Sequence, residues 1–442
     1  MSATVIAASD HEEAYVAAYR HAGGTLPGGA RLRRTRQSAI ERFSALGFPT
    51  THDEEWKYTS LAPFLKTPYQ PAATGVFTGE LPAASPGAPR LVFVNGRFAP
   101  ELSQTCALKG LKISPLKEAL ARRSIADRIG ATAAFENNAL VALNTAMFED
   151  GALVEIGDGA VIDAPVELLF LSASNGTPAV AYPRTLIVAG RESQAQIVET
   201  YRGGGTGLRP VGTFTSAVTE AAIADGAVIE HYKLQEESHE TLHFGMLAVR
   251  QGASSNFVSH NIAFGGALAR NEIAVVLDGE GAECTLNGLY VTGGRQHIDN
   301  YTTLDHAQPH SNSRELYKGV LDGKSQAVFH GRIIVRPEAQ KTDAIQRNKN
   351  LLLSDGAVIN TKPQLEIYAD DVKCTHGATV GQVDADAIFY LRSRGIALNE
   401  ARKLLTYAFT SEMAGVMKVE SVRERVGAAL LDRLASAAGG EE

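Results

Sequence analysis

The chain has 442 residues and a mass of 47.0 kDa, enough for two or three domains with a sizeable buried core. Its 42 Lys and Arg against 49 Asp and Glu give a formal charge of −7, so no basic field would attract nucleic acid or an anionic membrane. Cys106, Cys284 and Cys374 are too few for a disulfide framework. No secretory signal begins the sequence, and no apolar run approaches the roughly 20 residues of a membrane span. We therefore expect a cytoplasmic protein that binds neither nucleic acid nor membrane.

Residues 1–150 predict a mixed, mainly helical N-terminal domain. Asp10 is a suitable N-cap for a first helix, with acidic residues in the first turn. A second helix is expected over 32–46, because apolar residues recur at threes and Gly47 follows. After a connection rich in Pro, Ala and Gly, residues 91–94 and an Asn-Gly pair predict a strand with a tight turn. A short helix is expected over 115–124.

Residues 151–383 predict a core of β-strands. Short runs of β-branched and aromatic residues alternate with Gly or Asp-Gly, which is typical of strands joined by tight turns. The predicted strands cover 195–201, 228–233, 256–262, 285–291, 327–335 and 364–368.

A repeated pentapeptide suggests how these strands are arranged. Asp-Gly-Ala-Val-Ile occurs three times, beginning at Asp158, Asp225 and Asp355. The starts lie 67 and 130 residues apart, close to three and six times 22. Leu-Asp-Gly recurs at Leu277 and Leu321, 44 residues apart. Three strands of about five residues with tight corners use about 22 residues, so this period predicts a parallel β-helix of roughly ten three-stranded coils. An antiparallel β-sandwich with chance repeats is the alternative.

Residues 384–442 predict a C-terminal helical domain with three apolar stripes. Asp384 caps the first helix and Gly395 ends it. The second carries Ala401, Leu404, Leu405, Ala408 and Phe409, and the third carries Val419, Val422, Val426, Leu430 and Leu434. Because the tail offers these stripes few apolar partners, they must cover either the β-helix or another protein.

Three motifs need to be weighed for enzymatic or metal-binding roles. Residues 319–325 resemble a phosphate-binding loop, but Lys318 holds the place of the first glycine and a strand follows. Asp370 and Asp371 are adjacent, so on a strand they point to opposite faces and cannot flank one bond. The four histidines His297, His306, His310 and His330 could bind a metal or serve as polar rungs and loop contacts.

Cys374 and His376 form the most informative pair. On a strand they project from one face, with Thr375 on the other. Thiolate and imidazole together suit iron or zinc. A tetrahedral site needs four ligands, and the sequence has no second Cys-His pair of this kind. The pair is therefore either a packed thiol beside a hydrogen-bonded histidine, or half a metal site that another polypeptide completes.

The segment 361–381, which contains this pair, resembles the SufB/SufD family of iron–sulfur cluster assembly proteins. Similar matches occur at 313–318, 341–344, 348–354 and 390–395, and the segment 54–60 favours the SufD branch. This resemblance implies a right-handed parallel β-helix between helical ends. It also implies that the β-helix pairs with SufB, and that the C-terminal helices dock the SufC ATPase.

The same resemblance assigns expected roles to single residues. Cys374 and His376 match the surface that faces SufB, where a transient iron–sulfur cluster is expected to form between the two subunits. The residues that match the SufC-docking segment are Leu404, Leu405, Ala408 and Phe409. A reduced flavin is expected in the assembled complex, although the sequence has no flavin fingerprint.

We therefore expect a non-catalytic scaffold subunit of the SUF complex. Whether the chain pairs with a second copy of itself when alone stays open. The alternative is a carbohydrate-active β-helix enzyme, which needs carboxylates grouped on one groove.

Overall fold

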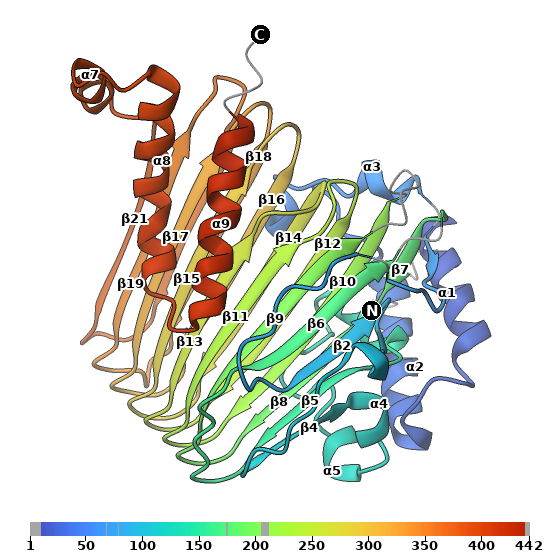
Figure 1. Cartoon of the computed structure of the whole chain (residues 1–442). Coiled ribbons are helices and arrows are strands. Elements are labelled where there is room, and N and C mark those ends of the chain that lie inside the picture. Colours follow the sequence, from blue (N-terminus) through green and yellow to red (C-terminus); the bar gives the residue numbers. More distant parts are fainter. Residues whose placement is uncertain (1–9, 68, 78, 174–175, 205–211, 438–442) are drawn as a thin grey trace.

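The computed structural model describes residues 10–67, 69–77, 79–173, 176–204 and 212–437, and two stacked β-sheets form its centre (Figure 1). Successive long strands alternate between the sheets. The eleven-stranded sheet contains β1 (Gln70–Pro71), β4 (Leu111–Pro115), β5 (Gly151–Ile156), β7 (Ala179–Ala181), β8 (Arg184–Ala189), β10 (Thr213–Ile223), β12 (Leu242–Gln251), β14 (Leu268–Leu277), β16 (His297–His306), β18 (Gln326–Val335) and β20 (Val358–Ile367). The ten-stranded sheet contains β2 (Arg90–Val94), β3 (Arg97–Phe98), β6 (Val166–Ala173), β9 (Gln194–Gly204), β11 (Val228–Glu236), β13 (Asn256–Ala263), β15 (Glu283–Thr292), β17 (Asn312–Leu321), β19 (Asp343–Leu352) and β21 (Lys373–Gly381).

Helices flank this centre at both ends of the sequence. The first group consists of α1 (Asp10–Ala22), α2 (Gly29–Leu46), η1 (Glu54–Trp56), α3 (Ala62–Leu65), η2 (Pro100–Leu102), α4 (Leu116–Ala119), α5 (Arg123–Ala126) and α6 (Ala139–Met147). The second consists of α7 (Ala385–Ser393), α8 (Leu398–Gly415) and α9 (Glu420–Ala437). None of the described helices is long and apolar enough to cross a membrane.

The strands pair as a parallel β-solenoid, which confirms the predicted fold class. Among the described residues, only the β2–β3 and β4–β5 pairings of these sheets are antiparallel. All other ladders are parallel, from β5–β8 to β18–β20 in one sheet and from β2–β6 to β19–β21 in the other. The antiparallel sandwich is therefore wrong. Because each long ladder joins consecutive coils along about ten residues, the solenoid is a continuous stack in which each coil supports the next.

The predicted coil of 22 residues, with three strands, is wrong. Each coil contributes one long strand to each sheet, and paired residues show its length: Leu242 and Leu268 lie 26 positions apart, while Gln326 and Val358 lie 32 apart. Longer coils also make the array shorter than the ten coils expected.

The pentapeptide misled because it marks a turn and the start of a strand, and such turns occur at both edges of the flattened solenoid. The copies at Asp158 and Asp225 lead into β6 and β11 of the ten-stranded sheet. The copy at Asp355 leads into β20 of the other sheet, half a coil out of phase.

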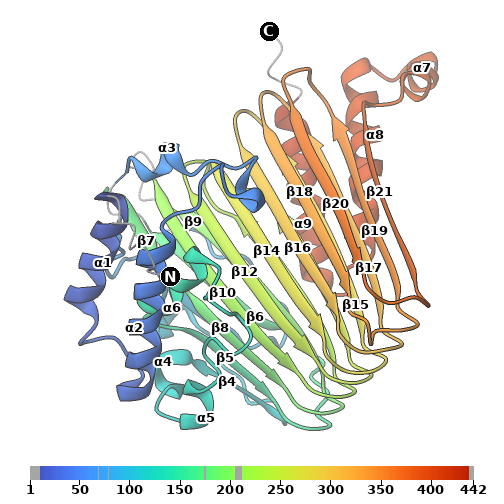
Figure 2. The same cartoon turned by 180° about the vertical axis from the view of Figure 1, so that it is seen from behind.

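The interior between the sheets is mainly apolar, and helices cover the outer faces unevenly. Side chains of α1, α2 and α6 pack against the outer face of the eleven-stranded sheet, over its early strands. Figure 2 shows these helices on one side of the solenoid and leaves β18 and β20 uncovered. On the opposite face, α8 and α9 pack on the ten-stranded sheet. The stripe predicted for the third tail helix is confirmed as buried from Val419 to Leu434.

Candidate functional site at the open end of the solenoid

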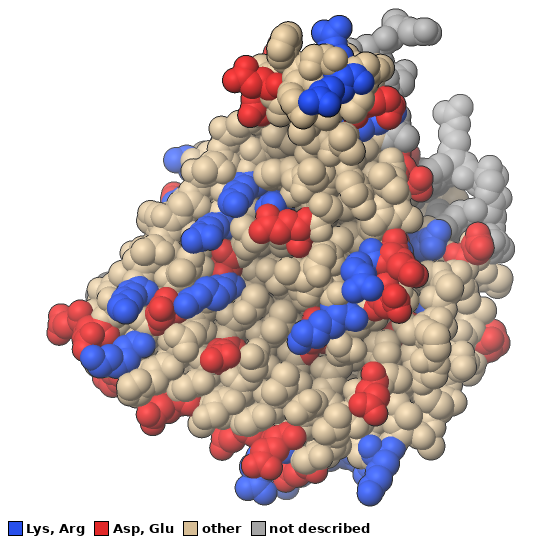
Figure 3. Space-filling model, turned by 60° about the vertical axis from the view of Figure 1, so that its left-hand side comes forward, with Lys and Arg blue, Asp and Glu red and all other residues tan. Residues whose placement is uncertain are grey.

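The last coil leaves the end of the solenoid open. β20 and β21 are the terminal strands of their sheets, so among the described residues each pairs through one edge only. Along β21 every residue is exposed except Cys374, which is half-buried. Figure 3, in which the β21 side of Figure 1 comes forward, shows uncharged surface between scattered acidic and basic side chains. An exposed, regular strand edge of this kind is a template for pairing with another chain.

Cys374 lies at the outer end of an interior column of side chains. Its partner in register on β19 is Ala344, and the column continues inward through Ser313 to Cys284. The Cys374 side chain packs against the apolar core between the sheets. Burial raises the pKa of the Cys374 thiol, so at neutral pH the sulfur is protonated. A metal bound there must displace that proton.

His376 ends the neighbouring interior column and is itself exposed. It is in register with Gln346, which is fully buried, and the column continues to Glu315. Cys374 and His376 thus lie on one face of β21, as the sequence predicts, about 7 Å apart along the strand. The structure thus combines features of both predicted alternatives: the Cys374 thiol is packed, as in a structural role, and the His376 imidazole is accessible, as a metal ligand must be. Together they offer two ligands, fewer than the four of a tetrahedral iron site.

Of the four histidines that the sequence groups together, three make polar side-chain contacts, and the exposed His310 donates its backbone N–H to the Gln340 carbonyl in a turn. His306 is buried, and its ring nitrogens lie 2.7 Å from Ser311 Oγ and 2.9 Å from Ser313 Oγ. His297 contacts Thr59, and His330 contacts Gln364. These are the polar rungs that the sequence allows as the alternative to a metal site. No group of three or more His, Cys, Asp or Glu residues in the described part of the chain is arranged to hold a metal ion.

The segment 54–60 packs on the outer face of the eleven-stranded sheet and is bonded to it. Arg270 lies 3.9 Å above the ring of Trp56 and donates to Asp299 at 2.5 Å. Thr59 donates its hydroxyl proton to the same Asp299 carboxylate at 2.6 Å. Ion pairs and hydrogen bonds thus link this segment to buried side chains of the sheet. The distinctive residues of this segment therefore have a structural role.

The four residues predicted to dock an ATPase differ in how far α8 exposes them. Leu404 is 50% exposed and Ala408 is exposed, whereas Leu405 and Phe409 are half-buried. Lys318 explains part of this difference, because its ammonium lies 4.6 Å from the Phe409 ring centroid and donates to the Phe409 carbonyl at 2.8 Å. The buried face of α8 is Ala401, Thr406, Thr410, Met413 and Ala414.

Two exposed aromatic residues on α7 were missed by the sequence reasoning. Phe389 is 74% exposed and Tyr390 is 57% exposed. α7 projects beyond the body of the solenoid next to the upper end of α8 (Figure 1). The adjacent aromatic residues in the sequence were a usable signal, because aromatic side chains are enriched in contact surfaces. Leu404 on α8 is also exposed, and we call these three residues of the C-terminal helices the tail surface: Phe389, Tyr390 and Leu404.

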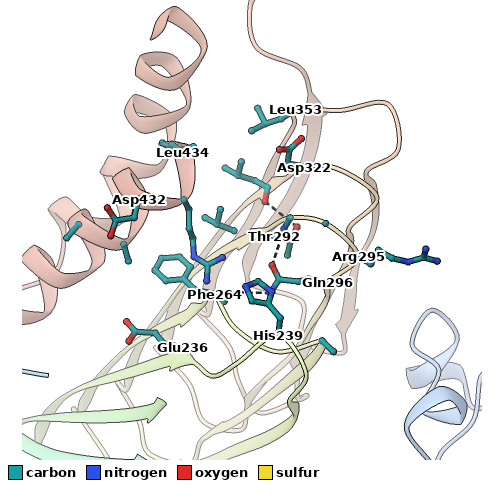
Figure 4. Close-up of a pocket in the computed structure, with 18 of the residues that line it drawn as sticks. Glu236, His239, Phe264, Thr292, Arg295, Gln296, Asp322, Leu353, Asp432 and Leu434 are labelled. Atoms are coloured by element: carbon teal, nitrogen blue, oxygen red, sulfur yellow. Dashed lines mark hydrogen bonds between the residues drawn. The ribbon is translucent and has the colours of Figure 1, made fainter. Parts of the chain in front are cut away.

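A large hollow lies elsewhere, between α9 and the turns beside the ten-stranded sheet (Figure 4). Its volume is about 1030 Å³, and Figure 4 shows the side chain of Arg295 pointing away from it. The lining mixes both signs of charge, and Arg425 is paired with Glu236. Neither Cys374 nor His376 lines this hollow. We therefore place the candidate site at the open end and not here.

Comparison with known proteins identifies the family. The model of the SUF system FeS cluster assembly SufBD core domain matches residues 170–409, and that of the SufBD protein N-terminal region matches residues 9–168. An iron–sulfur cluster assembly SufBD family protein of Synechocystis is 35% identical over 89% of each chain. The iron–sulfur cluster assembly protein SufD of Escherichia coli is 31% identical over 92% of this chain and 94% of its own length. The chloroplastic protein ABCI7 of Arabidopsis thaliana is 28% identical over 89% of this chain and 84% of its own. The chain therefore belongs to the SufBD family of iron–sulfur cluster assembly proteins of the SUF system.

Proposed function

We propose that this chain is the SufD-type scaffold subunit of a SUF complex and takes no catalytic part itself. Its open end pairs with SufB, and a nascent iron–sulfur cluster forms between the two subunits. The observation that carries this proposal is the placement of Cys374 and His376 on one face of a terminal strand whose outer edge has no partner among the described residues. Such a strand can gain a neighbour, and two ligands need a neighbour to complete their coordination.

In this proposal the cluster is cargo. Cys374 binds iron as a thiolate after losing the proton that burial favours, and His376 binds through a neutral ring nitrogen. The SufB subunit supplies the remaining ligands. Because the Cys374 thiol is partly shielded by the core, the sulfur stays protected until a metal arrives.

The tail surface is the proposed docking site of the SufC ATPase. Movement there reaches the solenoid through α8 and α9, which pack on the ten-stranded sheet through Met413, Val422 and Val426. The continuous parallel ladders of that sheet then carry displacement to the open end as a rigid body.

Carbohydrate hydrolysis has no comparable support. Asp370 and Asp371 lie in the exposed turn between β20 and β21, and Asp371 is paired with Lys341. The family match points to cluster assembly instead.

The experiment is His376→Ala, co-expressed with SufB and SufC. His376 is exposed on the terminal strand, so the variant should fold and assemble normally. The co-purified complex should contain less iron and absorb less light in the visible range than the wild type. Thr375→Ala is the matched control, because Thr375 is also exposed on β21 but points to the other face. Wild-type cluster content in the His376 variant would contradict the proposal.

A further inference from the structure

A buried glutamine lies directly behind His376 with an unused hydrogen-bond acceptor. Gln346 has no exposed surface and is the register partner of His376 on the adjacent strand. Among the described residues, no donor reaches its side-chain oxygen Oε1. A buried amide oxygen without a donor costs about 1–3 kcal/mol, so its retention at this position needs a reason.

The orientation of the Gln346 amide is fixed from the opposite side. Its Nε2 donates to Glu315 Oε2 at 2.7 Å, one strand further into the solenoid. An amide whose nitrogen is bound to a carboxylate cannot flip without losing that bond, so Oε1 stays an acceptor. Burial raises the pKa of Glu315 to about 7, which leaves this carboxyl able to accept in either protonation state.

Space for this amide is kept open by a glycine on the facing sheet. A Cβ atom at Gly331 would lie 2.3 Å from Gln346 Nε2, which is closer than any such contact allows. Any larger residue there would push the amide out of its place beside Glu315. Three residues from three strands thus hold one acceptor beneath the open end: Glu315 on β17, Gly331 on β18 and Gln346 on β19.

We propose that Gln346 is a positioning residue for His376: its Oε1 accepts the N–H of one ring nitrogen, so that the other nitrogen presents its lone pair at the open end. In-register side chains on adjacent parallel strands stand about 4.8 Å apart, within reach of such a bond after a rotation of the exposed ring. Histidine ligands commonly donate their second N–H to an acceptor, which fixes the tautomer and raises ligand basicity. This inference rests on the proposed role of His376 as a ligand.

The test measures the tautomer of His376 in the full chain, labelled with ¹⁵N in its histidine rings, without metal or partner. In the wild type, the ring nitrogens of His376 should show one dominant tautomer. Gln346→Leu removes the acceptor, so the two ¹⁵N shifts of His376 should move toward those of the exposed His52. Gln346→Glu restores an acceptor at the same place and should restore the wild-type pattern.

Gln364→Leu is the matched control, because it makes the same change near the open end on β20, away from His376. Its His376 shifts should equal those of the wild type. Identical His376 shifts in the wild type and in both Gln346 variants would overturn the proposal. This readout is separate from cluster assembly: normal clusters in His376→Ala would refute the ligand role, whereas unchanged shifts would refute the hydrogen bond. In the assembled complex, Gln346→Leu should lower metal affinity about 10-fold or more, with rescue by Gln346→Glu.

Discussion

Two histidines of this chain show how position along the solenoid sets chemistry. His306 lies inside a middle coil between two serine hydroxyls, and burial lowers its pKa to about 4. His376 lies on the terminal strand, exposed, with the same interior orientation. The residue type is the same, but only the second can meet a metal or a partner. The residue pattern alone could not separate these roles, because the difference depends on which coil is last; only the family resemblance pointed to His376.

The buried His306 predicts a stability loss in acid. Its folded pKa of about 4 lies below the ordinary value near 6.5, so between these values the unfolded chain binds more protons. The contribution is complete above pH 6.5 and is lost as pH falls toward 4, in total about 3 kcal/mol. His306→Gln should therefore show a flatter dependence of unfolding free energy on pH, measured by denaturant unfolding at fixed pH values. Equal slopes for both proteins between pH 7 and 4 would refute this assignment.

Among the elements, the C-terminal helices α8 and α9 differ in how well their apolar spacing predicts the buried face. α9 buries its whole predicted stripe against the ten-stranded sheet, as the 3–4 spacing indicates. α8 is less regular: Thr406 and Thr410 lie on its buried face, while Leu404 faces solvent. Apolar periodicity therefore predicted the helix but not which face packs, because the solenoid surface beneath it decides that. α6 was missed altogether, since an apolar helix buried all round has no amphipathic period.

Docking of the SufC ATPase on the tail surface predicts a specific effect of Leu404→Glu. Leu404 is half exposed, so a charge there costs the fold little. In a contact centre the same charge should weaken SufC binding by about 2 kcal/mol or more, on the order of 30-fold. Recovery of SufC with the affinity-purified variant measures this.

Leu431→Glu is the control for the docking prediction, because it makes the same change at a residue of α9 that is 55% exposed. It should leave SufC recovery unchanged. If Leu404→Glu retains SufC as well as the control does, the tail surface is not the docking site. Phe409→Glu is less informative, because Phe409 packs beside Lys318 and its loss also disturbs the solenoid.

For the whole molecule, the sequence predicts the class of fold correctly but not the length of each coil or the number of coils. Short runs of β-branched and aromatic residues identify the strands, and tight turns with Asp-Gly indicate a stacked array. Coil length was beyond reach, because the turn motif at Asp158 and at Asp355 recurs on opposite edges of two sheets. The sequence did place the end of the β core at residue 383, but which interior columns end exposed at β21 follows only from the stacking order. The sequence did not single out Gln346 for the same reason, because its place behind His376 depends on the stacking order.

The central claim is that a neighbouring subunit completes the open end, and a photo-crosslink tests it most directly. A photoreactive amino acid is placed at Ala378, which is exposed on β21, or at Val161, which is 57% exposed near the first coils. Each variant is purified with SufB, irradiated and analysed by mass spectrometry. We predict a covalent adduct with SufB from position 378 and none from position 161. An intact complex that yields an adduct from position 161 only, or from neither position, would contradict the account.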